Sequence, residues 1–543
     1  MQTPILGSAY TARSVNAADS RMVNLFPEVV PEGGKQPAFL QRCPGLVLQT
    51  VVGSGPIRGL WEHNGYLYVV SANTFYQVNS AWVATAKGTV DGTGLVSMAD
   101  NGTQIMIAAS PKGYIYNTLT GVFGQIADQD FPGASVVDYL DGYFVFIQPN
   151  SQRMWVTALL DGTSIDPLDF ASAEGDPDNI VSMIVDHREV WLFGNSSTEV
   201  WYNAGLPDFP LARIQGAFNE LGCAARYSVA KMNNQIYWLG KDPRGQGIVY
   251  VANGYQGQRV STHAVEWQIQ QYGDLSNAIG YTYQQDGHSF YVLVFPSVGK
   301  TWVYDAATGA WHERAGWDDS WTRYLGQTQV FFNGKNLLGD YENGNIYTVD
   351  QNTYAYNGGT QRWLRSWRAL PTGENTLRRT AQHALQLDCE TGIGLEQYPA
   401  YDAEDLAAEN GDLLIAEYVQ NDIVTESGDT LTTEAGDEFE TLVDTPDYPI
   451  PFVPPMYLTT TAYTAAPGYD PEVMLRWSDD GGHTWSNEHW RSMGKIGQYG
   501  YRTIWRRLGM TEKIRDRVYE VSGTDPVKIA IMGAELQISG TNA

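Results

Sequence analysis

A hairpin unit recurs seven times between residues 56 and 357, and it leaves few folds open to this chain. Each unit has a tight turn, then a strand of alternating aromatic and aliphatic residues, then a second strand, as in Asn64-Gly65 followed by Tyr66-Leu67-Tyr68-Val69-Val70. The turns begin 37 to 53 residues apart, at Asn64, Asn101, Asp141, His187, Asn233, Asp286 and Asn333. This spacing is typical of the four-stranded blades of a β-propeller.

The turn chemistry and the composition both favour this interpretation. Asn-Gly and Asp-Gly supply the positive φ that a two-residue hairpin needs, and 33 Tyr, 17 Trp and 56 Gly suit pleated strands joined by tight turns. One blade cannot cover its own faces, whereas six or seven arranged radially can. We predict an all-β fold, a six- or seven-bladed β-propeller with an additional β-sandwich or platform domain built from the C-terminal region and the N-terminal arm. The alternative is a large sandwich of unrelated hairpins.

The remaining segments give a domain division. We expect an N-terminal arm with platform strands at 1–55, the propeller at 56–357, linking strands at 358–385, an acidic inserted lobe at 386–462 and a C-terminal β-sandwich domain at 463–543. An extended arm leaves edge groups unpaired, so we also expect it to pair with other strands, across subunits in an oligomer.

A basic and aromatic segment follows the propeller. It reads Arg362-Trp363-Leu364-Arg365-Ser366-Trp367-Arg368, and strand alternation places Arg362 and Arg365 on opposite faces. One interpretation is a strip that contacts nucleic acid or another subunit. The other is a sheet strand whose arginine stems pack over tryptophan rings.

An acidic stretch comes next, because no Lys or Arg occurs between Arg379 and Arg476. A Glu-x-Gly-Asp motif recurs in it, with carboxylates at Glu409, Asp412, Glu426, Asp429, Glu434 and Asp437. Carboxylate oxygens suit Ca²⁺, but the spacing does not match an EF-hand loop. We expect no metal here, and a lobe whose carboxylates face a channel lumen or a partner.

The overall charge restricts the function classes. The chain has 61 acidic and 34 basic residues, a formal net charge of -27. Phosphate contacts need Lys and Arg, so this balance argues against a protein that grips DNA or reads its sequence. An acidic wall repels phosphate and suits a conduit through which DNA slides.

The C-terminal region contains one Asp-box hairpin, Ser478-x-Asp480-x-Gly482-x-Thr484-Trp485, in which Asp caps the turn and Trp covers it. An Asp box with a propeller raises the possibility of a sialidase. A sialidase needs several Asp boxes within the blades, three arginines that converge on a substrate carboxylate, and a Tyr–Glu pair together with an aspartic acid that acts as the general acid. Here the single box lies outside the repeat and no arginines stand at matched blade positions. We predict no enzymatic activity and no catalytic residue, with a carbohydrate-binding or sialidase-like propeller as the alternative.

Cofactors and targeting signals are not indicated either. Cys43, Cys223 and Cys389 lie far apart with no CxxC pair, so we expect neither a disulfide framework nor a zinc site. We expect no secretory signal and no membrane span, because the N-terminus lacks a basic region with an apolar run and no window approaches 18 apolar residues.

Several short segments stand in a distinctive order along nearly the whole chain: Asn24-Leu25-Phe26-Pro27-Glu28, Ile57-Arg58-Gly59, Ser197-Thr198-Glu199-Val200-Trp201-Tyr202, Trp505-Arg506-Arg507-Leu508-Gly509 and Gly533-Ala534-Glu535-Leu536-Gln537-Ile538. Together they resemble the tail-nozzle, or tail-hub, family of short-tailed, podovirus-like bacteriophages, whose members stabilise packaged DNA. The acidic lobe is longer than this family needs.

The resemblance implies a structural homohexamer of the virion tail, assembled in the host cytoplasm. Its channel would continue a portal and an adaptor ring in the head–tail connector, retain packaged DNA, and conduct it during genome ejection without sequence-specific binding. A tail needle or plug would close the lower end, and tail fibres or tailspikes would attach at the side. We expect subunit or partner contacts at Arg362, Arg365, Arg502, Trp505, Arg506 and Arg507, with the basic C-terminal strands packed against acidic surface rather than DNA.

Overall fold

The computed structural model describes residues 1–14, 18–30, 32–173, 175, 178–206, 209–242, 245–370, 379–395, 414–415, 424–425, 468–511 and 517–540. Strands account for 54% of the structure, and the described part contains one α-helix, α1 (His263–Gln270), so the predicted all-β class is confirmed. No helix within these residues is long and apolar enough to cross a membrane. The chain divides into a larger unit (Met1–Glu390, Val473–Arg491 and Thr503–Ala543) and a smaller unit (Thr391–Glu472 and Ser492–Arg502).

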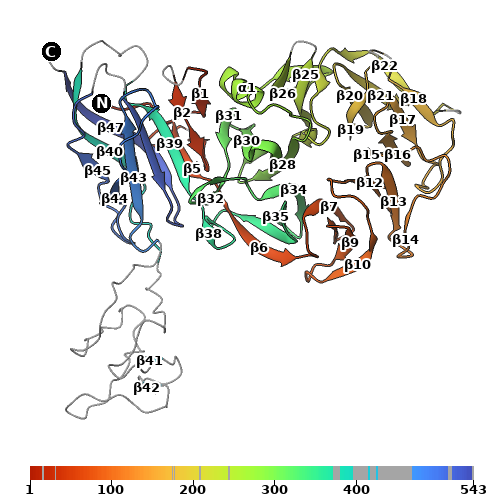
Figure 1. Cartoon of the computed structure of the whole chain (residues 1–543), viewed down its shortest axis with the longest axis horizontal. Helices are drawn as coiled ribbons and strands as arrows, with labels where there is room; N and C mark the ends of the chain where they lie inside the picture. The colour runs from red at the N-terminus through yellow and green to blue at the C-terminus, as the bar shows by residue number, and fades with distance from the viewer. Residues whose placement is uncertain are drawn as a thin grey trace. The chain divides into compact units, whose positions relative to one another are not determined.

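Seven antiparallel sheets of the larger unit's described residues form the blades of a propeller (Figure 1). Each blade contacts the next, and blade 7 contacts blade 1, so the ring is closed. In blade order the strands are β7 (Ile57–His63), β8 (Tyr66–Ser71), β9 (Thr74–Val78) and β10 (Ala84–Thr89); β11 (Ser97–Asp100), β12 (Gln104–Ala109), β13 (Lys112–Asn117) and β14 (Phe123–Gln125); β15 (Val136–Leu140), β16 (Tyr143–Ile147), β17 (Arg153–Val156) and β18 (Phe170–Ser172); β19 (Ile180–Asp186), β20 (Glu189–Gly194), β21 (Thr198–Asn203) and β22 (Leu211–Asn219); β23 (Gly222–Cys223), β24 (Ala230–Met232), β25 (Gln235–Asp242), β26 (Gly245–Asn253) and β27 (Gln256–Arg259); β28 (Ile279–Gln285), β29 (His288–Phe295), β30 (Lys300–Asp305) and β31 (Ala310–Glu313); and β34 (Gly326–Phe332), β35 (Lys335–Asp340), β36 (Asn345–Asp350) and β6 (Gly45–Val51).

The predicted turns are the hairpins between the two inner strands of each blade. Asn64 and Gly65 have φ of 52° and 74°, and even the unusual pair His187 and Arg188 has φ of 49° and 64°. Two successive positive φ values match the twist of the flanking strands. The seven sequence repeats therefore correspond one to one with the seven blades.

The N-terminal arm completes the last blade. Strands β34, β35 and β36 follow one another in sequence, but the fourth strand is β6, antiparallel to β36 with Leu46 opposite Val349. The ends of the propeller sequence are thus held together by a backbone ladder, and the ring cannot open without breaking it.

One nine-stranded sheet connects the propeller to the sandwich. Blade 6 continues from β31 through β3 (Met22–Val23) into β39 (Trp363–Arg368). Val23 lies opposite Glu313 in a parallel pairing and opposite Leu364 in an antiparallel one. The sheet then continues with β46 (Val518–Gly523), β43 (Glu472–Ser478) and β44 (His489–Ser492).

The second sheet of the sandwich also uses the arm. Its order is β4 (Leu25–Val29), β5 (Ala38–Arg42), β47 (Ala530–Gly540), β40 (Thr380–Cys389) and β45 (Ile504–Arg506). A sandwich built from the C-terminal region and the arm was predicted, and it is confirmed. The arm strands β3 to β6 pair inside the chain, whereas we expected pairing across subunits. The short elements are β1 (Tyr10–Thr11), β2 (Asp19–Ser20), η1 (Pro296–Val298), β32 (Gly316–Asp318), β33 (Ser320–Thr322), β37 (Ala355–Tyr356), β38 (Gly359–Thr360), β41 (Leu414–Ile415) and β42 (Val424–Thr425).

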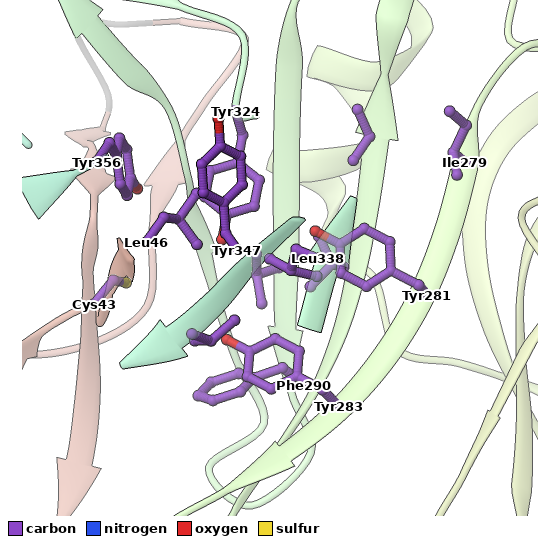
Figure 2. Packing of buried hydrophobic residues seen from close by; sticks show 14 of the residues in the cluster. Cys43, Leu46, Ile279, Tyr281, Tyr283, Phe290, Tyr324, Leu338, Tyr347 and Tyr356 are labelled. Carbon is purple, nitrogen blue, oxygen red and sulfur yellow. The ribbon is translucent and has the colours of Figure 1, made fainter. Parts of the chain in front are cut away.

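A tyrosine-rich core lies where blades 6 and 7 meet the arm (Figure 2). Blade 6 contributes Tyr281 and Tyr283, blade 7 contributes Tyr347, and the arm contributes Cys43 and Leu46. All of these side chains are at most 6% exposed, because both faces of a blade are covered by its neighbours. The arm is therefore packed into the ring as well as paired with it.

Substitution of Gly45 should weaken ring closure. A Cβ at Gly45 would lie 2.5 Å from the carbonyl oxygens of Thr353 and Ala355, which are backbone atoms that cannot move aside freely. We expect Gly45→Ala to lower the free energy of unfolding by about 1–3 kcal/mol, measured by urea titration of tryptophan fluorescence. Gly124→Ala is the control, because a Cβ there meets nothing within 4 Å. Equal midpoints for the two variants would contradict this account.

Candidate functional site

The described residues contain no cluster of three or more His, Cys, Asp or Glu side chains placed to hold a metal ion. The most elaborate polar arrangement is instead a buried joint between arm, propeller and sandwich, defined by Asn24, Arg42, Gln361, Arg362 and Arg365. A second feature is a basic edge of the sandwich.

Asn24 stands between β3 and β4 and is fully buried, with φ of 54°. Its Nδ2 donates to the carbonyl oxygens of Ala315 at 2.8 Å and Arg362 at 2.7 Å. Its Oδ1 accepts from the Ala315 backbone N–H and from the Tyr356 hydroxyl, both at 3.1 Å. Every donor and acceptor of the amide is used, so one side chain fixes the arm to blade 6, to the end of the propeller and to the linking strand.

Arg42 makes the matching connection from β5. Its Nε donates to Gln361 Oε1 at 2.9 Å, one Nη to the carbonyl oxygens of Val527 (2.9 Å) and Asp525, and the other to those of Tyr354 (3.1 Å) and Gln361. All five N–H groups are therefore satisfied. Burial lowers the pKa of Arg42 to about 10, so the guanidinium stays charged at neutral pH. Its positive charge is stabilised by backbone carbonyl oxygens that come from both domains.

Arg362 and Arg365 lie in this joint, on and beside β39. Arg362 donates to Glu488 at 2.7 Å and to the Ser522 hydroxyl at 3.0 Å, and its guanidinium lies 4.4 Å from the centroid of the Trp317 ring. Arg365 is 1% exposed and donates to the carbonyl oxygen of Ile5 at 2.7 Å. Burial lowers the pKa of Arg365 to about 10. Arg362 immediately precedes β39, and its guanidinium, rather than its stem, lies over a tryptophan ring.

The basic edge lies where the edge strands of the two sandwich sheets, β44 and β45, approach each other. Arg491 Nε donates to the Ile504 carbonyl oxygen at 3.3 Å, and Trp505 Nε1 donates to that of His489 at 2.7 Å. Trp505 is 1% exposed and holds the strands together from inside. The exposed side chains of this edge include Trp490, Arg491, Arg506 and Arg507, and we call these four residues the basic edge.

The other predicted interface residues are more scattered. Arg502 is exposed but belongs to the smaller unit. The carboxylates of the predicted acidic lobe, Glu409, Asp412, Glu426, Asp429, Glu434 and Asp437, lie outside the described residues. Trp490 and Arg491 were missed, although the sequence His489-Trp490-Arg491 repeats the basic-aromatic composition that singled out Arg362.

The Asp box is a turn cap in the sandwich. Asp480 accepts from the Ser478 hydroxyl, from the backbone N–H of His483 and from both the backbone N–H and the hydroxyl of Thr484, at 2.6 to 3.0 Å. These hydrogen bonds, led by that of Ser478, hold the pKa of Asp480 far below its usual range. Trp485 stacks on Arg476, whose guanidinium is 4.8 Å from the ring centroid. The carboxylate is fully occupied within its own hairpin.

Phe26 of the arm contacts a histidine pair of blade 6. Its ring centroid is 4.9 Å from that of His288 and 6.0 Å from that of His312. His288 Nδ1 is 2.8 Å from the fully buried carboxylate of Asp305, and this hydrogen bond raises the pKa of His288. The folded protein therefore favours the protonated form of His288, which pairs β29 with β30 inside blade 6.

Comparison with known proteins gives a match over most of the chain. A family model described as "Bacteriophage P22 Gp10, beta-propeller" matches residues 1–354, and one described as "Bacteriophage P22 Gp10, beta-sandwich" matches residues 456–539. No curated protein sequence is significantly similar to the chain.

Solved structures resemble it only weakly. The computationally designed Ika8 protein is 15% identical over 56% of this chain and 99% of its own, with a TM-score of 0.35. A streptogramin B lyase is 11% identical over 60% and 97%, with a TM-score of 0.38. The extracellular domain of the putative one-component system BT4673 from B. thetaiotaomicron is 10% identical over 73% and 47%, with a TM-score of 0.40. Values this low carry no inference about fold or function.

Loss of the Asn24 amide should destabilise the joint. Asn24→Ala leaves the Ala315 N–H buried without its partner and removes one hydrogen bond of the Tyr356 hydroxyl. It also places alanine at a positive φ of 54°. We expect a loss of about 3 kcal/mol or more in the free energy of unfolding. Asn150→Ala is the control, because Asn150 has nearly the same φ of 53° but is exposed. A similar urea midpoint for both variants would show that the side-chain hydrogen bonds contribute little.

The His288–Asp305 pair predicts a pH dependence. The pKa of His288 is raised in the folded state, so its contribution is complete below the unfolded pKa of about 6.5 and is lost as pH rises through the folded pKa. Stability should therefore fall more steeply with rising pH in the unchanged protein than in His288→Gln. Thermal unfolding followed at several values between about pH 6 and pH 9 measures this difference. Parallel curves would assign the pH dependence to other groups.

Proposed function

Because the chain belongs to the Bacteriophage P22 Gp10 family, we propose that it is one subunit of a phage tail nozzle. Family membership makes it a structural protein of the tail of a short-tailed phage, in contact with other virion components. The proposed nozzle is a homohexamer below the portal and adaptor ring. It retains packaged DNA until infection and conducts it during ejection.

The proposed partners follow from that position. The upper end meets the adaptor ring, a needle or plug closes the lower end, and fibres or tailspikes attach at the side. Six copies carry six times -27, a formal charge of -162. A channel of this sign repels phosphate and lets the duplex slide without sequence-specific binding.

The observation that carries the proposal is the nine-stranded sheet shared by propeller and sandwich. A nozzle under a pressurised head must transmit force between its parts without hinging. Backbone ladders on both edges of β3 and the buried bonds of Asn24 and Arg42 resist such hinging. A pair of domains joined by one flexible linker would not suit this task.

The finer assignments belong to the same proposal. We propose the division into arm (1–55), propeller (56–357), linking strands (358–385), acidic lobe (386–462) and sandwich (463–543), no catalytic role, and assembly on filled heads in the host cytoplasm. Among the predicted contact residues, Arg365 and Trp505 are buried inside the chain, where they stabilise the sandwich. We therefore assign the subunit contacts to the exposed residues Arg502, Arg506 and Arg507.

Electron microscopy tests the nozzle directly. The purified protein would be imaged by negative stain, alone and after mixing with phage heads that carry the adaptor ring. Sixfold rings, or heads that gain a nozzle, support the proposal. A protein that stays monomeric and never docks would overturn it.

Charge reversal on the basic edge should impair assembly. Arg506→Glu places a negative charge against the acidic surface that we propose for the neighbouring subunit. Like charges in contact at an interface weaken the association of the two subunits. We expect the concentration needed for ring or nozzle formation to rise about tenfold or more, measured by counting nozzle-bearing heads across a dilution series. Arg153→Glu, an exposed arginine on blade 3, makes the same charge change elsewhere and should assemble normally. Equal assembly by both variants would exclude Arg506 from the interface.

A further inference from the structure

The basic edge carries positive charge that the described part of the chain does not neutralise. Several exposed bases elsewhere pair with carboxylates of the same chain: Lys35 with Asp388, Lys112 with Asp91, Arg188 with Asp141 and Lys528 with Glu390. At the basic edge, Arg491 donates to the neutral carbonyl oxygens of Trp490 at 2.9 Å and Ile504 at 3.3 Å. Arg506 and Arg507 form no ion pair and no side-chain hydrogen bond with any described residue. Three arginines at one place therefore have no carboxylate partner among the described residues.

The basic edge also exposes apolar surface. In β44, His489, Trp490 and Arg491 are all exposed, so both faces of this strand meet solvent. Charged residues alone protect a sheet edge from pairing with other chains. An exposed tryptophan, here 46% exposed, adds the apolar area that such protection avoids. Tryptophan with arginine is the composition enriched at protein interfaces, so the basic edge has the character of a contact surface.

The partner of this surface must be acidic, and the chain itself contains a fitting sequence. Residues 396–467 include 16 Asp and Glu residues and no Lys, Arg or His. The acidic residues are most concentrated in Glu434-Ala435-Gly436-Asp437-Glu438-Phe439-Glu440, which has four carboxylates and one aromatic ring within seven residues. Carboxylates are the preferred partners of guanidinium groups, and a phenyl ring suits an exposed indole. The two sequences are therefore complementary in charge and in apolar character.

The acidic segment is long enough to reach another molecule. It begins and ends at one place, because the Leu395 backbone N–H donates to the carbonyl oxygen of Gly468 at 2.7 Å. Between these two residues lie 72 others. At about 3.3 Å per extended residue, a chain of this length can extend at most roughly 100 Å out and back. A neighbouring copy in a ring lies within this reach.

We propose that the basic edge of one copy binds residues 434–440 of a second copy. This inference rests on the proposed ring, and it names the acidic surface that the subunit contact uses. Copies with a formal charge of -27 repel one another, so they need opposite charges where they meet. A contact within one chain would leave this repulsion between copies unopposed. Because the contact is exposed to solvent, added salt weakens it.

Cross-linking of the full chain tests the contact. Arg506→Lys keeps the positive charge and adds an amine. A water-soluble carbodiimide joins such an amine to a touching carboxylate as an amide and takes up the water that is lost. Copies labelled with ¹⁵N and unlabelled copies would be mixed before assembly, and the cross-linked peptides identified by mass spectrometry. We expect links from position 506 of one isotope to residues 434–440 of the other.

Arg153→Lys is the matched control, because Arg153 is an exposed arginine on blade 3. We expect about tenfold fewer links from this position to residues 434–440. Equal yields would show only a general attraction between opposite charges and would overturn the inference. Links confined to one isotope would assign the acidic segment to its own chain and overturn it as well.

Negative-stain images of the same samples separate this inference from the proposed nozzle. Sixfold rings without links to residues 434–440 overturn the inference and leave the nozzle standing. Links between isotopes in a protein that forms neither rings nor nozzles support the contact and overturn the nozzle. The absence of both links and rings overturns both.

Neutralisation of the carboxylates locates the contact within the acidic segment. One variant combines Glu434→Gln, Asp437→Asn, Glu438→Gln and Glu440→Gln, and its matched control combines Asp402→Asn, Glu404→Gln, Asp405→Asn and Glu409→Gln. Both variants lose four negative charges. We expect the concentration needed for ring or nozzle formation to rise about tenfold in the first variant and not to rise in the control. Equal assembly by the two variants contradicts the assignment of residues 434–440.

Discussion

Strand β3 is two residues long, yet its hydrogen bonds on both edges make one body of the propeller and the sandwich. Without it, β31 would end blade 6 with an open edge and β39 would begin a separate sheet. The chain then turns at Asn24, whose left-handed backbone directs β4 into the other sheet of the sandwich. The positions of the later arm strands β4, β5 and β6 depend on this change of direction.

The arm joins segments that are far apart in sequence, and this has a consequence for folding. Strand β6 pairs with β36, which lies about 300 residues later in the sequence. Arg42 donates hydrogen bonds to Gln361 and Val527, and Asn24 donates to Ala315 and Arg362. Such non-local contacts carry a large loop-closure cost before they contribute stability, so they form late. Blades 1 to 5, in contrast, are made of consecutive hairpins that can form locally. We therefore expect the ring and the joint to be completed together, when the arm packs into place.

The buried polar groups divide into two kinds. At the joint, Asn24 and Arg42 use every hydrogen-bonding atom on backbone or side-chain partners from several elements, so burial of polar groups there specifies a single arrangement. In the neighbouring tyrosine-rich core, the Arg314 guanidinium instead lies 5.1 to 5.9 Å from the ring centroids of Phe290, Tyr283 and Tyr324. The first kind joins residues of the arm, the propeller and the sandwich by hydrogen bonds. The second places a cation against aromatic faces inside the core.

The sequence by itself determined the fold class, the number of hairpin units and the positions of their turns, because tight hairpins need residues such as Asn64-Gly65 that tolerate positive φ. It also indicated the Asp480 turn cap, since that motif is local. Only the tertiary structure decided that β6 belongs to blade 7 and β3 to blade 6, because short arm strands carry no periodic signal of their partners. The tertiary structure also decided that Arg365 is buried, where it donates to the carbonyl oxygen of Ile5, and that Arg506 is exposed at a sheet edge. Both are arginines in or beside basic-aromatic strands. What distinguishes them is which distant segment covers the strand, and that depends on contacts that local sequence does not encode.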